Sequence, residues 1–304
     1  MNMKHITVLL NESIEQLNIK PNGIYVDGTL GGAGHSELIL KNLSDEGHLY
    51  AFDQDTYAIN TATKKLESYN NVTIIHDNFA NVKKRLLDLG VTKVDGLLLD
   101  LGMSSFQIDD ESRGFTYLKD ARLDMRMNQE QTLTAEEIVN TYSKEDLSEI
   151  FFKYGDEENG FKIANRIISA RPLHTTGELV DICDRVNFKR KGHSSKKVFQ
   201  ALRIAVNDEL RVLETLLEDS LDFLNDDGRL VIITFHSLED RIVKHFFKKH
   251  STLDVPKNMP LINIEQPILE LVTRKPIYPS DVEMTDNSRS KSAKLRVAKK
   301  RDAN

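Results

Sequence analysis

The feature that most constrains the fold of this chain is a regular alternation of short apolar runs with stretches of helical periodicity in its first hundred residues. Four such runs end at intervals of 26, 23 and 24 residues, and they span residues 24–27, 49–53, 72–76 and 94–100. This alternation is typical of β-α-β units in a parallel sheet. The fourth run contains three consecutive leucines, as expected for a strand covered on both faces. The chain is therefore predicted to be an α/β protein.

A long interruption follows the fourth run. The next comparable apolar run, residues 229–235, ends 135 residues after Asp100. Helix-start signals fill the interval, namely capping boxes at Thr134-x-x-Glu137 and Thr175-x-x-Glu178, and a cap at Ser143 before a helix that Gly155 should end. We therefore predict an inserted helical domain over residues 108–206, between the two halves of an α/β domain at residues 1–107 and 207–304.

Beyond the insert, the sequence predicts a return to the sheet. The strand 229–235 is followed by a helix that Ser237 is expected to cap. Edge strands are predicted over residues 264–275 and 294–299. The tract between them, residues 276–292, is rich in Pro, Ser, Asp and Asn and is predicted to be a loop.

The first strand runs into a glycine-rich turn, Asp27-Gly28-Thr29-Leu30-Gly31-Gly32-Ala33-Gly34-His35-Ser36. Glycine permits positive φ angles and close approach of a ligand, and the N–H groups of a following helix would point at that ligand. The dinucleotide fingerprint G-x-G-x-x-G is absent. An acid followed by small residues at alternate positions is nearer to the D-x-G-x-G-x-G pattern of enzymes that use S-adenosyl-L-methionine (AdoMet) to methylate substrates. An ordinary strand-to-helix turn is the alternative, and this stretch alone does not decide between them.

Later strand ends carry further side chains suited to a nucleotide site. Asp53 lies about twenty residues beyond the glycine-rich turn, where a carboxylate accepts the ribose hydroxyls in doubly wound folds. Asp55 is a rival, although we expect it to cap the next helix. Phe79 follows the third strand and either offers its ring to an adenine or packs in the core. Asp100 ends an apolar strand at the crevice where open α/β sheets bind ligands.

Composition narrows the classes of function. The single cysteine, Cys183, excludes an intramolecular disulfide and a cysteine-cluster metal site, and we expect it to be a small core residue. No stretch approaches the roughly 20 apolar residues of a membrane span, so we expect a soluble, cytoplasmic protein. No metal-ligand spacing, G-x-S-x-G motif or P-loop lysine is present, which disfavours metalloenzymes, hydrolases and kinases.

A basic run within the predicted insert contrasts with the net charge of −6. Residues 185–203 contain no acid, and their seven fixed cations are Arg185, Lys189, Arg190, Lys191, Lys196, Lys197 and Arg203. Within the run, Gly192-His193-Ser194-Ser195 is a candidate phosphate-binding loop. Such a run suits an RNA backbone. A solvated basic face is the alternative.

Many separated motifs closely resemble those of one family, the bacterial small-subunit ribosomal RNA (cytosine-N4)-methyltransferases, RsmH, also called MraW. The resemblance runs nearly end to end. The motifs are His5-Ile6-Thr7-Val8-Leu9-Leu10, Asp27-Gly28-Thr29 with Gly31 and Ala33-Gly34-His35-Ser36, Asp100-Leu101-Gly102-Met103-Ser104-Ser105, Arg113-Gly114-Phe115, Leu123-Asp124-Met125-Arg126-Met127, the stretch from Phe199 to Asn207, Phe235-His236-Ser237-Leu238-Glu239-Asp240-Arg241 and Arg289-Ser290-Lys291-Ser292.

The resemblance implies a Rossmann-like AdoMet-dependent methyltransferase sheet with an inserted helical domain that recognises RNA. It implies AdoMet as methyl donor, N4 of a cytidine near the decoding centre as acceptor, and small-subunit (16S) ribosomal RNA or the ribosomal subunit as partner. The family's AdoMet contacts fall on Ala33, Gly34, His35, Asp53, Phe79, Asp100 and Gln107. The family usually has proline where this chain has Phe106, which makes Gln107 the least secure contact.

The acceptor chemistry leaves the proton acceptor open. The exocyclic amine of cytosine is a poor nucleophile because its lone pair is delocalised into the ring, so a group that accepts its proton would help. Asp100 is a candidate, with Asn207 and His236 as rivals. An alternative function is a ribosome-assembly factor that binds RNA and AdoMet with little turnover. A methyltransferase with a small-molecule or protein substrate would leave the basic run without a role.

Overall fold

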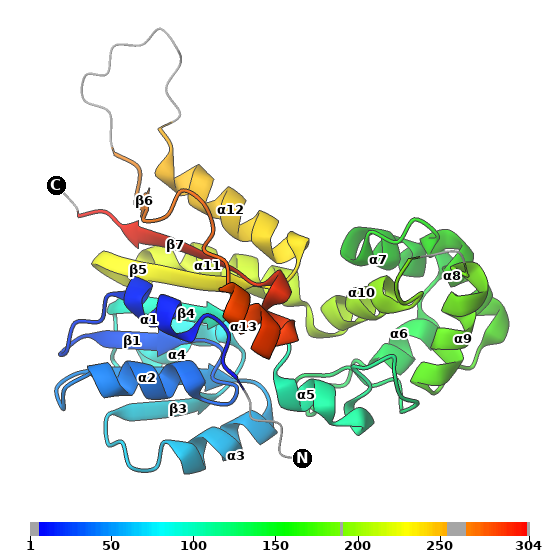
Figure 1. The fold of residues 1–304 in the computed structure, drawn as a ribbon, viewed down its shortest axis with the longest axis horizontal. Coiled ribbons are helices and arrows are strands. Elements are labelled where there is room, and N and C mark those ends of the chain that lie inside the picture. The colour runs from blue at the N-terminus through cyan, green and yellow to red at the C-terminus, as the bar shows by residue number, and fades with distance from the viewer. Residues whose placement is uncertain (1–5, 189–190, 254–265, 303–304) are drawn as a thin grey trace, which may run out of the picture. The chain divides into compact units, whose positions relative to one another are not determined.

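The computed structural model describes residues 6–188, 191–253 and 266–302 (Figure 1). The chain divides into two compact units. The first unit consists of Met1–Gly102 and Leu210–Asn304, and the second of Met103–Glu209. The predicted helical insert, residues 108–206, lies inside the second unit. In the described part of the chain, no helix combines the length and the apolar character that crossing a bilayer requires.

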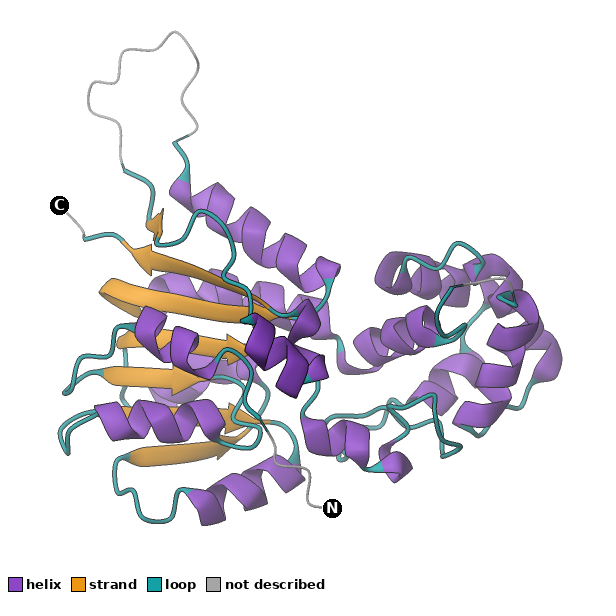
Figure 2. Ribbon diagram, viewed as in Figure 1, coloured by secondary structure: helices purple, strands orange, loops and turns teal. Residues whose placement is uncertain are grey.

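The first unit is built on a seven-stranded sheet in the order β3-β2-β1-β4-β5-β7-β6 (Figures 1 and 2). The strands are β1 Ile24–Asp27, β2 His48–Asp53, β3 Val72–His76, β4 Val94–Asp100, β5 Leu224–Thr234, β6 Leu269–Leu271 and β7 Lys294–Lys300. The first five strands run parallel, and β7 is antiparallel to both β5 and β6. The order 3-2-1-4-5 is that of a Rossmann-like doubly wound sheet, so the predicted fold class is confirmed.

Helices cover both faces of this sheet, as the alternating side chains of β4 show. Leu98 packs in one core with residues of α1, α2 and α3. Leu97 and Leu99 pack in a second core with residues of α4, α11 and α12. The helices are α1 Leu10–Leu17, α2 Gly34–Asn42, α3 Thr56–Lys65, α4 Val82–Asp88, α11 Glu209–Phe223 and α12 Ser237–Ser251. All three leucines are fully buried, which confirms that β4 is a central strand.

Three sequence predictions in the second half of this unit were wrong. The edge strand predicted over residues 264–275 is limited to β6, Leu269–Leu271, and residues 264 and 265 lie outside the described residues. Strand β5 begins at Leu224 rather than at residue 229, because Leu224 already pairs with Val94 before a register shift in the ladder. The tract 276–292 is not only loop: it holds the short helix α13, Asp281–Asp286, and the 3-10 turn η3, Ser288–Ser292. Ser280 starts α13 by accepting a hydrogen bond from the Glu283 amide, a cap that the polar composition of the tract concealed.

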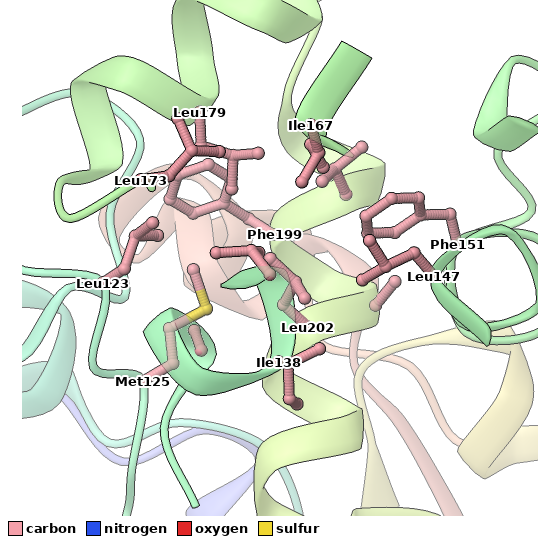
Figure 3. Close-up of a cluster of buried hydrophobic side chains, with 14 of the residues drawn as sticks. Leu123, Met125, Ile138, Leu147, Phe151, Ile167, Leu173, Leu179, Phe199 and Leu202 are labelled. Carbon is pink, nitrogen blue, oxygen red and sulfur yellow. The ribbon is translucent and has the colours of Figure 1, made fainter. Parts of the chain in front are cut away.

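The second unit is helical and has its own core. Its helices are α5 Ser105–Asp109, α6 Ala135–Thr141, α7 Lys144–Gly155, α8 Gly160–Ala170, α9 Thr176–Val186 and α10 Lys196–Asn207, with the 3-10 turn η2 Glu111–Arg113 after α5. Figure 3 shows buried side chains from several of these helices and from the segment 123–125 meeting in one cluster, in which Phe151, Phe199 and Leu202 contribute from α7 and α10. The lone cysteine, Cys183, is fully buried there, as predicted.

Most of the predicted helix starts in this unit are confirmed. Thr134 and Ser143 cap α6 and α7, and Thr175 forms a complete capping box with Glu178. The role expected for Gly155 was wrong, because the left-handed residue that ends α7 is Asp156, with φ 50°. Gly155 is instead a close-packing position, since a Cβ there would lie 2.5 Å from the Lys197 carbonyl oxygen of α10.

Candidate functional site

The carboxyl ends of β1, β2 and β4 lie side by side because β1 pairs with both neighbours. Each of these strands ends in an aspartate: Asp27, Asp53 and Asp100. The chain reverses its winding direction between β1 and β4, and this switch point is where open α/β sheets bind their ligands. The structure therefore brings the glycine-rich turn and the predicted acids to one place in the first unit.

Asp27 holds the glycine-rich turn in shape. Its carboxylate accepts hydrogen bonds from the Thr29 amide at 3.0 Å and from the Ser36 hydroxyl at 2.6 Å, and the residue is 1% exposed. Burial raises the pKa of this carboxyl, and the two hydrogen bonds oppose that rise. Ala33, at the end of the turn, has the left-handed φ of 56°, and α2 begins directly after it. The turn thus presents the amino end of α2, which favours a ligand with anionic or acceptor groups.

Asp53 faces the same turn and differs from its rival. One carboxylate oxygen of Asp53 accepts a hydrogen bond from the Gly31 amide at 2.8 Å, and the other accepts from the Asp55 amide at 2.9 Å. Burial is the main cause that raises the pKa of Asp53 to about 6. Asp55 caps α3 by accepting from the Tyr57 amide at 2.9 Å, as predicted. Asp53 therefore lies against the glycine-rich turn, whereas Asp55 belongs to the start of α3.

Phe79 opens the 3-10 turn η1, Phe79–Asn81, directly after β3. It is partly buried against the core that contains Leu97 and Leu99. Its Cβ lies 3.4 Å from the point that a Cβ on Gly28 would occupy, so its base adjoins the start of the glycine-rich turn. Both roles considered for Phe79 are compatible with this position.

Asp100, which is partly buried, lies beside the buried His35 at the switch point. The Asp100 amide donates to the Thr29 hydroxyl at 2.6 Å, and the carboxylate oxygen Oδ2 lies 3.8 Å from Nδ1 of His35, which is 3% exposed. The other oxygen, Oδ1, is buried and accepts no hydrogen bond from the described residues. Burial, followed by the charges of Asp27, Glu239 and Glu283, raises the pKa of Asp100 well above its usual value. Oδ1 is therefore a buried acceptor that a bound ligand can satisfy.

His236 begins α12, and this corrects the predicted cap. Its side chain accepts from the Glu239 amide at 3.5 Å, while the Glu239 carboxylate accepts from the amides of Phe235 at 2.9 Å and His236 at 3.2 Å. With Ser237 as the cap, the third helical residue would be Asp240, whose carboxylate instead binds Lys294 and Arg296. His236 thus has a clear structural role at the end of β5.

Two of the residues predicted for cofactor binding or catalysis, Gln107 and Asn207, belong to the helical unit, and both form hydrogen bonds within it. Gln107 forms a capping box with Ser104, in which its side-chain oxygen accepts from the Ser104 amide at 3.1 Å. This box orients Gln107 without the proline that Phe106 replaces. Asn207 binds the segment that contains Met125 and Met127: it accepts from the Met127 amide at 2.7 Å and donates to the Met125 carbonyl at 2.8 Å.

The basic run is only partly available to a partner. Lys189 and Arg190 lie outside the described residues. Arg185, Lys191 and Lys196 are exposed, whereas the Lys197 ammonium donates to the Asp156 carbonyl. The Arg203 guanidinium forms two hydrogen bonds of 2.8 Å with Glu209, and both side chains are about nine-tenths buried. Counting charges along the sequence therefore overestimated the number of cations that are free to bind a partner.

The candidate phosphate-binding loop is also turned inward. Ser194 and Ser195 are buried, and the Ser194 hydroxyl donates to the Asp184 carboxylate. The Asn187 side chain donates to the Ser194 carbonyl at 3.0 Å and joins it to the buried Glu157. Neighbouring carboxylates repel a phosphate, so the prediction of a phosphate-binding loop from these serines is not supported by their surroundings.

A doubly wound sheet whose switch point gathers a glycine-rich turn and three aspartates defines a Rossmann-like nucleotide-binding enzyme. The carboxylates of Asp100 and Asp53 suit a ligand with a positive charge and ribose hydroxyls, which AdoMet has. The chain belongs to the MraW methylase family, which matches residues 2–301. The protein is accordingly a methyltransferase, and its methyl donor is AdoMet.

Similar proteins have been named in several bacteria. The chain is 62% identical over 298 residues to "Ribosomal RNA small subunit methyltransferase H 1" of Acholeplasma laidlawii, covering 98% of this chain and 99% of that protein. It is 53% identical over 307 aligned residues to "Ribosomal RNA small subunit methyltransferase H" of Streptococcus pyogenes, covering 97% of each. A solved rRNA methylase from Streptococcus thermophilus aligns with 99% of both chains at 14% identity, with a TM-score of 0.42, which is too low to bear on function.

Proposed function

We propose that this methyltransferase transfers the AdoMet methyl group to N4 of a cytidine in small-subunit ribosomal RNA, near the decoding centre, in the cytoplasm. The observation that carries the proposal is similarity over almost the whole chain, helical unit included, to two relatives named for small-subunit ribosomal RNA. A nucleotide site alone would leave the substrate open. Similarity that extends through the helical unit supports a shared RNA substrate.

The first unit would hold AdoMet at the switch point of the sheet. We assign the ribose hydroxyls to the Asp53 carboxylate and the amino acid portion to the turn formed by Ala33, Gly34 and His35. Phe79 would lie along the adenine, and Gln107 completes the set of contacts we propose. When bound, AdoMet supplies a methyl group made electrophilic by the neighbouring sulfonium. The residues of the chain align the acceptor with that methyl group, and alignment is the larger part of catalysis for such a displacement.

Asp100 is the group we propose to accept the proton of the cytosine amine. Its Oδ1 is buried without a hydrogen-bond partner among the described residues, and burial raises its pKa, which makes it a stronger base than an exposed carboxylate. Asn207 and His236 are the rivals. The Asn207 amide already holds Met125 and Met127, and the His236 ring caps α12, so each would have to exchange an existing contact.

For RNA, we propose that the exposed cations of the basic run meet phosphates: Arg185, Lys191 and Lys196, together with Lys189, Arg190 and Lys197. Arg203 is left out of this set because Glu209 neutralises it. Phosphate contacts of this kind give affinity without sequence specificity. Base selection would then come from the catalytic site.

Mass mapping of modified nucleosides in small-subunit RNA, from cells with and without this protein, tests the proposal. We expect one N4-methylated cytidine to disappear in its absence, to return with the wild-type chain, and not to return with Asp53→Ala. An unchanged modification map would refute the assigned reaction. If ribosome assembly failed while the map stayed unchanged, the assembly-factor alternative would be favoured.

A further inference from the structure

A segment far from the glycine-rich turn in sequence packs directly on it. Thr7 lies against Gly34, the first residue of α2. A Cβ added to Gly34 would come within 1.9 Å of the Thr7 hydroxyl oxygen, 2.9 Å of its Cβ and 3.1 Å of its Cγ2. Any side chain at position 34 would therefore overlap Thr7. The Thr7 side chain thus packs against the middle residue of the proposed AdoMet contacts Ala33, Gly34 and His35.

The segment that carries Thr7 is held on both sides by the helix α13 region. Before Thr7, the Ile6 carbonyl accepts a hydrogen bond from the Asn287 side chain at 3.2 Å. After it, the Leu9 amide donates to Oε1 of Glu283 at 2.8 Å. Figure 1 shows the red α13 beside the blue start of the described chain. Two side chains one helical turn apart therefore fix the backbone around Thr7.

Glu283 uses its carboxylate for this contact instead of for its own helix. It occupies the third position of α13 after the cap Ser280, where a glutamate commonly accepts from the cap amide and closes a capping box. The structure shows only half of that box, the bond from the Glu283 amide to the Ser280 hydroxyl. No residue of α13 is buried, so the helix contributes no side chain to the core. Its described long-range contact through Glu283 is the hydrogen bond with the Leu9 amide.

Leu9 needs such support because its backbone is strained. It has the left-handed angles φ 50° and ψ 36°, which cost a side chain about 1 kcal/mol or more. Leu9 is fully buried and precedes α1, so it cannot relax without moving that helix. In this conformation the Leu9 amide donates its hydrogen bond to the Glu283 carboxylate.

We propose that Glu283 is a positioning residue for AdoMet binding, which acts through Leu9 and Thr7 to hold the Ala33–Gly34–His35 turn in its binding conformation. The inference takes the ligand and its contacts from the proposed function. It adds a residue about 250 positions away in the sequence that does not itself bind the ligand. Glu283 also adds negative charge near Asp100, so the experiment has to separate position from charge.

Two substitutions make that separation. Glu283→Ala removes both the acceptor and the charge, whereas Glu283→Gln removes the charge and keeps an oxygen that can accept from the Leu9 amide. Asp286→Ala is a matched control because it deletes an exposed acid from the same helix. AdoMet affinity is measured by titration calorimetry. Hydrogen exchange of residues 6–9 and 33–36 is measured without AdoMet and without RNA.

We expect Glu283→Ala to lower the affinity for AdoMet about tenfold, which corresponds to the free energy of one hydrogen bond to a charged group. It should also speed exchange in both segments. Glu283→Gln should stay within about threefold of wild type, and Asp286→Ala should match wild type. If Glu283→Gln lost as much affinity as Glu283→Ala, charge would be the cause and the positioning role would be refuted. Faster exchange at residues 6–9 with unchanged AdoMet affinity would refute it equally.

The result stays interpretable if Glu283→Ala fails to fold. Asn287→Ala removes the bond to the Ile6 carbonyl together with the bond from the Arg289 amide that starts η3, and we expect the same changes at smaller amplitude. Normal exchange and affinity in a folded Asn287→Ala protein would overturn the proposal in that case. If the proposed RNA substrate proved wrong, these measurements would be unaffected, because they are made without RNA. A wild-type protein that bound no AdoMet would instead refute the proposed contacts, while the exchange of residues 33–36 would still report on the role of Glu283.

Discussion

The Asp53 carboxylate accepts a hydrogen bond of 2.8 Å from the Gly31 amide, so the group that we assign to the ribose also fixes the glycine-rich turn. Its pKa is raised to about 6. Above that pH the carboxylate accepts from the ribose hydroxyls, and below it the protonated acid has lost an acceptor site. AdoMet affinity should therefore fall as the pH is lowered from 7.5 to 5, with a midpoint near 6, in calorimetric titrations across that range.

Asp53→Asn is the control for this titration, because the amide does not ionise there. We expect it to bind AdoMet about tenfold more weakly at pH 7.5 and to lose the midpoint near 6. Asp53→Ala should weaken binding more than His35→Ala does. A midpoint that persisted in Asp53→Asn would show that another group, such as Asp100, titrates instead.

Asp100→Asn tests the proton acceptor. The amide keeps the size of the side chain but cannot take up a proton. We expect kcat for methyl transfer to fall roughly 10²-fold, the usual share of a general base, with a smaller change in AdoMet affinity. Single-turnover rates with saturating RNA and AdoMet measure this. A variant that lost only AdoMet affinity would assign Asp100 to the cofactor alone.

Asn207→Ala should act on stability. Its side chain accepts from the Met127 amide and donates to the carbonyls of Met125 and Arg203, and it is 6% exposed. Leaving these buried groups without a partner should lower the free energy of unfolding by about 2–3 kcal/mol, measured by urea denaturation. The exposed Asn165→Ala serves as comparison. If kcat fell while stability did not change, Asn207 would belong to the chemistry.

The cations of the basic run should contribute unequally to the salt dependence of RNA affinity. Replacing the exposed Lys191 and Lys196 by Ala should reduce the slope of log K against log salt by about 1.4, or roughly 0.7 for each contact to single-stranded RNA. The paired variant Arg203→Met/Glu209→Gln, which removes the buried ion pair together, should leave the slope unchanged. Filter binding of a small-subunit RNA fragment over a range of salt concentrations measures both. Equal effects would mean that Arg203 leaves Glu209 for the RNA.

Gly34→Ala should destabilise the protein because its Cβ overlaps Thr7. We expect a loss of about 1–3 kcal/mol, typical of overpacking. Thr7→Gly removes the overlapping atoms, so the double variant should recover most of that loss in a thermal or urea melt. A double variant as unstable as Gly34→Ala would mean that the cost arises elsewhere, for example in the capping geometry of α2.

The sequence predicted the parallel strands and their terminal acids because both depend on local patterns. Apolar runs with a regular spacing specify β-α-β units, and a parallel sheet must bring the carboxyl ends of its strands to one edge. Asp27, Asp53 and Asp100 could therefore be placed together before any coordinates were known. The caps at Ser143 and Thr175 are likewise short-range signals.

The features that the sequence did not reveal depend on contacts between distant residues. The Glu283 side chain meets Leu9 across 274 positions, which no local pattern encodes. Arg203 was counted as a free cation because its partner, Glu209, lies beyond the end of the acid-free run. The inward orientation of Ser194 depends on Asp184, on the preceding helix.

Strand β7 lies between β5 and β6 although it follows both in the sequence. During synthesis, β6 therefore emerges with no neighbour to pair with, and β5 keeps one edge unpaired until β7 arrives. The helix α13 also follows β5 and precedes β7, so the segment around Thr7 is synthesised more than 270 residues before its partners Glu283 and Asn287. The contacts that Glu283 and Asn287 make with this segment can therefore form only after α13 has been synthesised. If Glu283 positions the glycine-rich turn as proposed, AdoMet binding would become effective only after this late packing step.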